Sequence, residues 1–345
     1  MTERAPSPPA PDFFGVEITR RCTLRCPHCY TASGPRGMAG PSTAAVIDLI
    51  ARLVPLGVRS VAFSGGEPLL RTDLEAIMLA GREAGVRSYG LVTNGALVEP
   101  ERALSLRRAG LVIAQISLDG VDEADHRAVR ACSPADFYRA LSAARLFKAV
   151  GVRVDFACIL NPRNLERAPE MVLLAEAIGV HTLRYCTFVP SGRARSRRIR
   201  ATYEPAPEAV DRFLAFLRDL AARPDRPLEV VIDHSIGPWD ARGRFRCRAG
   251  KAVAYVTCEG DLYPCPALLF PPFKVGNVFE QPLDQLFASP AMRRPRDVER
   301  SELVGPCDAC ASVACSGGCR GMAWAQTGDA LRTPPYCNVQ RRGEG

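Results

Sequence analysis

Three cysteines close to the N-terminus have a spacing that suits an iron–sulfur cluster. Cys22, Cys26 and Cys29 are separated by three and two residues, and they follow an apolar run that is typical of a strand. Three thiolates on such a loop can bind three corners of a four-iron, four-sulfur cube. The fourth iron then has no protein ligand, so it can bind a substrate or cofactor, as the open position of a catalytic zinc ion does.

Two other kinds of site fit part of this segment. Cys26-Pro27-His28-Cys29 alone has the form of a thioredoxin-like redox pair. That pair requires a helix beginning at its first cysteine, yet Gly34 and Pro35 follow almost at once, and Cys22 is left unexplained. A zinc site of three cysteines and His28 places the histidine awkwardly between two ligands. The residues therefore favour a cluster.

A second group of cysteines lies in the C-terminal third. The chain has 14 cysteines and a polar, proline-rich N-terminus unlike a secretion signal, which argues for metal or redox chemistry and against a disulfide framework. A zinc ribbon is the main alternative, but two Cys-x2-Cys pairs at ribbon spacing are lacking. The group comprises Cys247, Cys258, Cys265, Cys307, Cys310, Cys315, Cys319 and Cys337.

A glycine pair follows the second apolar run, in the segment Ser64-Gly65-Gly66-Glu67-Pro68. Adjacent glycines let a backbone approach a ligand closely. Glu67 and the backbone carbonyls can accept hydrogen bonds from an ammonium group. Alone, the segment is better explained by a plain turn.

The elements that must position these residues follow a repeated pattern. Strands are predicted at about 14–19, 58–64, 87–93, 112–118, 152–159 and 181–187, with helical patterns such as 43–56 between them. Ser42 or Thr43 is expected to cap that helix. The repeat predicts an α/β fold, a partial (β/α)6 TIM-like barrel at 14–225, followed by a small Cys-rich domain at 226–345. Residues 1–13 are expected to be a disordered tail.

Chemistry in such folds sits at the carboxyl ends of the strands, and strand alternation selects the inward side chains. In the fourth strand the apolar positions Val112, Ala114, Ile116 and Leu118 are expected to face the helices. The inward set is then Gln115, Ser117, Asp119, Asp155, Arg184 and Cys186. Asp155 and Arg184 are candidates for substrate contact, and Cys186 is a candidate catalytic residue. Cys132, Cys158 and Cys186 itself are most simply small buried hydrophobic residues.

The remaining composition excludes several classes. Net charge is +8, but 42 of the 45 cationic residues are arginines, and no aromatic and basic motif supports nucleic-acid binding. No apolar run approaches the roughly 20 residues of a membrane helix. We expect a cytoplasmic protein without nucleic-acid or membrane partners. The arginine-rich stretch 191–200 is interpreted as a solvated loop, or alternatively as a mobile anion-binding loop at the barrel mouth.

The N-terminal cysteine triad and the glycine pair together resemble radical S-adenosylmethionine (SAM) enzymes. The resemblance implies that Cys22, Cys26 and Cys29 hold the 4Fe–4S cluster that binds SAM. It implies that Gly65, Gly66, Glu67 and Pro68 hold the SAM amino group, and that His28 lies beside the adenine. Further SAM contacts are implied at Asn94, Ser117, Asp119 and Arg130, with Arg130 on the carboxylate. Helix caps, turns and surface charge are the alternative for these four.

The C-terminal cysteines resemble the SPASM extension of the same family. The resemblance implies one auxiliary iron–sulfur cluster on Cys307, Cys310, Cys315 and Cys337, although the third interval is four residues rather than five. A second auxiliary cluster is implied on Cys247, Cys265 and Cys319, completed by Cys258. Sulfatase-maturing members have an Asp where this chain has Pro266, which argues against that activity.

The implied activity is reductive cleavage of SAM to a 5′-deoxyadenosyl radical, which abstracts hydrogen from an unactivated carbon. Cys186 could then donate hydrogen to the substrate radical. An oxidoreductase or lyase is expected, with a flavodoxin or ferredoxin as electron donor. We expect a small natural product as substrate (a sugar, nucleoside or other carboxylate-bearing metabolite), because the barrel begins near residue 14 and leaves no room for an N-terminal peptide-recognition domain. Its fate would be decarboxylation, dehydrogenation or epimerisation. The alternatives are modification of a ribosomally made peptide and, outside enzymology, an electron carrier or a structural metal protein.

Overall fold

A computed structural model describes residues 11, 13–223, 226–233, 247–295, 297–307, 310, 315 and 317–337. Its centre is a curved sheet whose first seven strands are parallel neighbours in chain order. All six predicted strands are confirmed, with ends within two residues of those expected. The seven are β1 Phe13–Glu17, β2 Ser60–Ser64, β3 Ser88–Thr93, β4 Leu111–Ser117, β5 Arg153–Ile159, β6 Thr182–Cys186 and β7 Glu229–Asp233.

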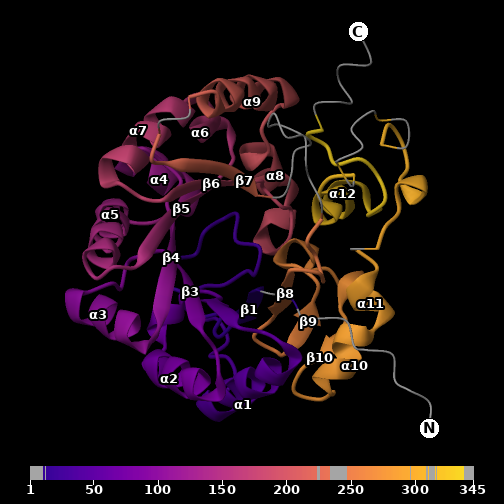
Figure 1. Cartoon of the computed structure of the whole chain (residues 1–345). Helices are drawn as coiled ribbons and strands as arrows, with labels where there is room; N and C mark the ends of the chain where they lie inside the picture. The colour runs from indigo at the N-terminus through magenta and orange to yellow at the C-terminus, as the bar shows by residue number, and fades with distance from the viewer. Residues whose placement is uncertain are drawn as a thin grey trace.

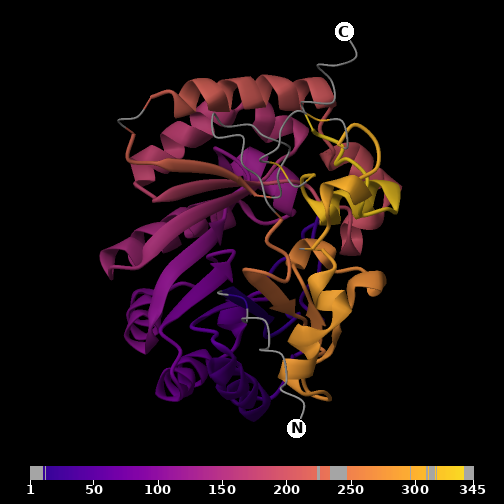
Figure 2. The same cartoon turned by 45° about the vertical axis from the view of Figure 1, so that its right-hand side comes forward.

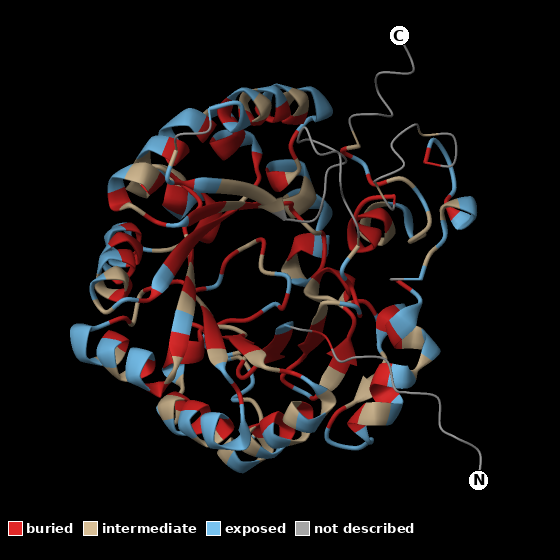
Figure 3. Ribbon diagram, viewed as in Figure 1, coloured by how far each residue is buried: buried red, intermediate tan, exposed pale blue. Residues whose placement is uncertain are grey.

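Helices form an outer layer around this sheet (Figure 1). They bury apolar stripes against the strands and expose their outer faces, as the colours of Figure 3 show. The predicted cap is confirmed, since Ser42 accepts a 3.2 Å hydrogen bond from the Ala45 amide. These helices are α1 Thr43–Leu53, α2 Leu74–Ala84, α3 Pro100–Ala109, α4 Glu123–Arg130, α5 Pro134–Ala149, α6 Pro162–Glu166, α7 Ala168–Ile178, α8 Arg197–Tyr203 and α9 Pro207–Ala221.

The cysteine-rich segment continues the sheet rather than standing apart from it. Strand β8 pairs in parallel with β1, and the ten-stranded order is β10-β9-β8-β1-β2-β3-β4-β5-β6-β7. Figure 2 shows this segment, orange to yellow, along one side of the barrel. Its elements are β8 Val253–Val256, β9 Asp261–Tyr263, β10 Gly276–Asn277, α10 Leu283–Ala288, α11 Pro290–Arg293 and α12 Arg320–Thr327. Strand β7 lies beyond the expected boundary near 225 and pairs with β6, and the boundary itself stays a prediction.

Short 3-10 segments complete the described elements: η1 Val54–Leu56, η2 Pro68–Leu70, η3 Gly192–Arg195, η4 Pro266–Leu268, η5 Pro271–Phe273 and η6 Arg300–Glu302. The interpretation of residues 191–200 as a loop is wrong, because η3 and α8 occupy most of this stretch. In the described residues, no helix is long and apolar enough to cross a membrane.

The predicted alternation in β4 holds for three of four positions. Ala114, Ile116 and Leu118 are fully buried, but Val112 is 40% exposed. The register between β3 and β4 shifts beside this residue, and Leu111 takes the buried position instead. A bulge of this kind changes which side chain faces the core.

Candidate active site at the carboxyl ends of the strands

The three N-terminal cysteines lie together on the loop that leaves β1. Cys22 and Cys26 are buried and pack in one small cluster with Leu24, and Cys29 packs against it. No helix begins at Cys26, so the thioredoxin-like alternative is not supported. Burial raises the pKa of Cys22 to about 12, and its neighbours Cys26 and Cys29 add to this. The positive charge of a bound metal would favour the thiolate form at this position.

The glycine pair is required by the cysteine loop itself. The Gly66 amide donates to the Thr19 carbonyl at 2.7 Å, and the Glu67 amide to the Arg21 carbonyl at 2.8 Å. A Cβ atom on Gly66 would lie 2.1 Å from the Arg21 carbonyl oxygen. The close approach expected toward a ligand is thus made first toward the backbone before Cys22.

The Glu67 carboxylate joins the ends of two strands. It is fully buried, and one oxygen accepts hydrogen bonds from the Thr93 hydroxyl at 2.8 Å and the Leu69 amide at 3.1 Å. The other oxygen accepts from the Asn94 amide at 2.8 Å. Most of its acceptor capacity is used within the protein, which leaves the Gly65 and Gly66 carbonyls as the more available acceptors for an ammonium group.

Asn94 links the same strand end to the cysteine loop. Its side-chain amide lies 3.0 Å from the Thr23 hydroxyl and 3.8 Å from the Cys22 sulfur. Asn94 is therefore placed to contact both the cysteine loop and a ligand bound at Cys22.

A buried charge pair follows β4. The Asp119 carboxylate, fully buried, accepts from Arg130 Nε at 2.5 Å and from the Ile159 amide at 2.6 Å. Burial alone would raise the pKa of Asp119, but Arg130, the two histidines His28 and His126 and the Ile159 amide together outweigh it, so the pKa lies below the usual range. The Cys26 thiol is close enough for its charge to raise the pKa of Arg130, so the Asp119–Arg130 pair lies beside the cysteine loop. Because the Asp119 carboxylate already accepts from Arg130 and from the Ile159 amide, its role is to hold the Arg130 guanidinium in place.

His28 lies at the same place. Its Nε2 atom is 3.9 Å from the nearer Asp119 oxygen and, in the described part of the chain, has no hydrogen-bond partner. Burial lowers the pKa of His28 to about 4, so the ring is neutral near pH 7. A buried, unpaired ring nitrogen beside the cysteine loop fits a polar ligand such as an adenine.

The arginine-rich stretch braces the cysteine loop, which the sequence did not reveal. The Arg193 amide donates to the Cys29 carbonyl at 3.1 Å, and its Nε donates to the Cys26 carbonyl at 2.9 Å. A Cβ on Gly192 would lie 2.2 Å from the Tyr30 carbonyl oxygen. Sequence patterns alone predict only a solvated or an anion-binding loop for this stretch.

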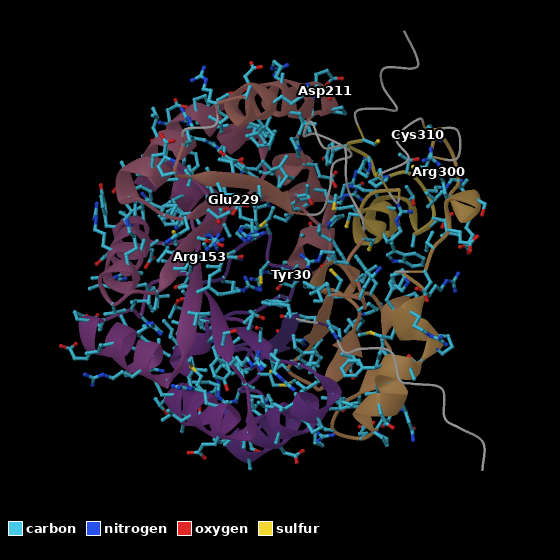
Figure 4. All side chains as sticks on the ribbon, viewed as in Figure 1. Tyr30, Arg153, Asp211, Glu229, Arg300 and Cys310 are labelled. Carbon is cyan, nitrogen blue, oxygen red and sulfur yellow. The ribbon has the colours of Figure 1, made fainter. Side chains whose placement is uncertain are left out.

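The barrel interior is polar, as the alternation predicts. Asp155, 1% exposed, lies 3.6 Å from the guanidinium of Arg184 and 3.3 Å from that of Arg153. Arg153 and Glu229, labelled in Figure 4, pair at 3.3 Å. Arg153 and Glu229 begin β5 and β7, whereas Ser117 and Cys186 lie at the carboxyl ends of β4 and β6 and are partly exposed.

A tyrosine pair inside the barrel was also missed. The Tyr255 hydroxyl lies 2.9 Å from the Ser64 hydroxyl, and Tyr30 hydrogen-bonds Tyr255. Figure 4 shows Tyr30 within the ring of strands. Tyr255 belongs to β8, whose pairing with β1 no local pattern predicted.

The C-terminal cysteines form two neighbourhoods. The charges of Cys307 and Cys310 act on Cys315, and that of Cys247 acts on Cys319, while Cys247 and Cys265 pack against one apolar cluster. The described Cys337 is partly exposed, and Cys310 lies outside the ring of strands (Figure 4).

Cys258 occupies a different environment. It is buried in the turn after β8, and its amide donates to Glu17 at 3.0 Å. The charged groups that act on its thiol are Glu17, Glu259 and Arg20. Its assignment as fourth ligand stays a prediction.

The donor chemistry fits iron–sulfur clusters. Backbone amides point at the thiols, from Leu24 to Cys22 at 3.4 Å, from Gly317 and Gly318 to Cys315, and from Gly321 and Met322 to Cys319. Such donors stabilise cluster thiolates. Within the described ranges no three His, Cys, Asp or Glu residues surround one metal position, and cluster thiolates need not, since each binds a different iron.

Comparison with known proteins decides the family. A model described as the radical SAM superfamily matches residues 16–175, and one described as an iron–sulfur cluster-binding domain, SPASM, matches 247–311. A PqqA peptide cyclase of Methylocella silvestris is 33% identical over 94% of this chain and 86% of its own. The chain belongs to the radical SAM superfamily, in its SPASM subfamily. Its cofactors are accordingly SAM, a 4Fe–4S cluster and auxiliary iron–sulfur clusters.

Other relatives of similar identity carry names from a different chemistry, the synthesis of hemes. An AdoMet-dependent heme synthase of Methanosarcina barkeri is 29% identical over 97% of this chain and 98% of its own. A pre-heme d1 synthase of Dinoroseobacter shibae is 30% identical over 93% and 84%. Among solved structures, Streptococcus suis SuiB bound to SAM superposes with a TM-score of 0.74 at 17% identity, covering 95% of this chain and 77% of that one. That likeness shows the fold.

Proposed function

We propose that this radical SAM enzyme modifies a ribosomally made peptide, beginning with hydrogen abstraction from an unactivated carbon. The 33% identity to a PqqA peptide cyclase, over most of both chains, carries the proposal. When bound, SAM and its cluster supply the 5′-deoxyadenosyl radical. The protein's own task is to orient both partners and to exclude water and competing hydrogen donors.

The residues at the strand ends divide this task. Cys22, Cys26 and Cys29 would hold the SAM-binding cluster. The Gly65 and Gly66 carbonyls would accept from the SAM ammonium, with Glu67 and Pro68 fixing that turn. The remaining contacts would come from His28, Asn94, Ser117 and Arg130, with Asp119 holding Arg130 in place.

The C-terminal cysteines would hold two auxiliary clusters with the ligand sets given above, and these would supply or remove an electron. A flavodoxin or ferredoxin would deliver the electron that starts the reaction. Cys186, at the carboxyl end of β6, would be the hydrogen donor only in a redox-neutral outcome, in which the substrate keeps its mass because the protein returns a hydrogen atom to the radical. A Cys186→Ser variant would then keep SAM cleavage and lose the quenched product.

A second candidate is a small carboxylate-bearing metabolite, processed by an oxidoreductase or lyase reaction. The observation that favours it is the interior Arg184, 3.6 Å from Asp155, together with the heme-related names of two relatives. Arg184→Met would raise KM for such a substrate with little change in kcat. Arg153→Met, at a guanidinium that is 46% exposed, is the matched control.

The test is an anaerobic assay with reductant and SAM. Candidate peptides encoded beside the gene are compared with tetrapyrrole and sugar carboxylates, and the triple Cys22/Cys26/Cys29→Ala variant is the blank. We expect 5′-deoxyadenosine to form with one peptide, whose mass falls by two hydrogen atoms. Turnover stimulated only by the small carboxylates would overturn the peptide proposal in favour of the second candidate.

A further inference from the structure

Arg320 is a charged residue in an unusual position. It follows Cys319 directly, begins helix α12, and is only 1% exposed. Burying a guanidinium is costly unless its donors and charge are compensated.

The compensation within the described residues is incomplete. Arg320 Nη1 donates to the Ala330 carbonyl at 2.7 Å and the Arg332 carbonyl at 3.4 Å, and Nε donates to the Gly318 carbonyl at 3.2 Å. No carboxylate pairs with it there. Its Nη2 atom is buried and has no acceptor in that part of the chain.

The unpaired nitrogen lies against the loop that carries cysteines. A Cβ on Gly317 would lie 2.9 Å from Nη2, and the Gly317 amide itself points at the Cys315 thiol. The Arg320 amide points at the Cys247 thiol. One residue thus reaches toward both cysteine neighbourhoods.

The charges around Arg320 agree with this geometry. Those acting on it come from Cys247 and Cys319 in one neighbourhood and from Cys307 and Cys315 in the other. An anionic cluster at these thiols would supply the acceptor and the countercharge that the guanidinium lacks.

We propose that Arg320 tunes the auxiliary clusters, with Nη2 donating a hydrogen bond to a sulfur of the cluster on Cys307, Cys310, Cys315 and Cys337. A reduced cluster carries one more negative charge than an oxidised one, so a buried positive charge favours reduction. The inference rests on the cluster assignment and needs no peptide.

The first test is an EPR-monitored redox titration of the reconstituted full chain. We expect Arg320→Met to make the reduction potential of an auxiliary cluster more negative, and Arg320→Lys to restore it in part. Each tenfold fall in the reduction equilibrium constant corresponds to about 59 mV for one electron. Arg332→Met removes a neighbouring charge that is 59% exposed, and should leave the potentials unchanged. Unchanged potentials in an iron-replete Arg320→Met variant would overturn the proposal.

A second measurement keeps the proposal testable if the Arg320→Met variant does not retain its iron. Wild-type protein is labelled with guanidino-15N arginine, and the reduced auxiliary clusters are studied by pulsed EPR. A hyperfine coupling to a guanidinium nitrogen is expected, and it should vanish in Arg320→Lys. Absence of the coupling in wild-type protein would refute the hydrogen bond. Neither measurement uses a substrate, so failure of the peptide assay leaves both results standing.

Discussion

The buried pair between Asp119 and Arg130 gives the sharpest prediction about how the site is built. Asp119→Asn keeps the shape of the side chain but removes its charge. The new amide then presents a donor to Arg130 Nε, which Asp119 accepts from at 2.5 Å in the wild type. The guanidinium, 10% exposed in its side chain, is left without a countercharge.

The magnitude follows from that burial. Removing one partner of a buried ion pair costs about 3–5 kcal/mol, whereas an exposed pair contributes about 0–1 kcal/mol. Since each kcal/mol shifts Tm by roughly 2–4 °C in mid-sized domains, Asp119→Asn should lower Tm on the order of 10 °C. The double variant with Arg130→Met removes the stranded charge. Its cost should fall short of the two single costs by about 2 kcal/mol.

The assay is anaerobic thermal unfolding of the reconstituted protein at pH 7, with Asp48→Asn as control, because its partner Arg52 lies on the exposed face of α1. Additive costs for Asp119→Asn and Arg130→Met would show that the two side chains are not coupled. A separate equilibrium-dialysis experiment measures SAM binding, which Arg130→Met should weaken more than Asp119→Asn does. Equal SAM affinity in wild type and Arg130→Met would remove Arg130 from the SAM site.

Two further predictions concern the same strand ends. Gly66→Ala should displace the cysteine loop and lower the iron content of the N-terminal site, because its Cβ would lie 2.1 Å from the Arg21 carbonyl oxygen, while Gly34→Ala, with no atom nearer than 3.7 Å, should retain full iron. Burial lowers the pKa of His126 to about 4, and its Nδ1 accepts from the Asp119 amide at 3.2 Å. The neutral His126 ring therefore contributes its full share of the free energy of unfolding above about pH 6.5. This share, roughly 3 kcal/mol in all, is lost as the pH falls toward 4. His126→Asn should flatten the plot of unfolding free energy against pH between pH 6.5 and 4. An unchanged slope would show that His126 does not cause this pH dependence.

Much of the architecture could be predicted from local pattern. Apolar runs of five to seven residues alternating with amphipathic stretches specify strands and helices, and the carboxyl ends of parallel strands meet at one edge. For that reason the cysteine triad, the Gly65-Gly66 turn, Asn94 and Asp119 could be expected near one another before any coordinates. The inward positions of Asp155 and Arg184 follow from the two-residue period of a strand.

The sequence by itself determined the order of the first six strands, the motif at each of their ends and the family to which they belong. Only the tertiary structure decided which atoms those motifs have left for a ligand. Glu67 is largely occupied by Thr93, Leu69 and Asn94, and Arg193 braces a loop 164 residues before it in the chain, at Cys29. Tyr255 enters the barrel through a strand that pairs with β1. The physical reason is that hydrogen bonds and packing between distant segments depend on distances of a few ångströms, which no periodicity along the chain encodes.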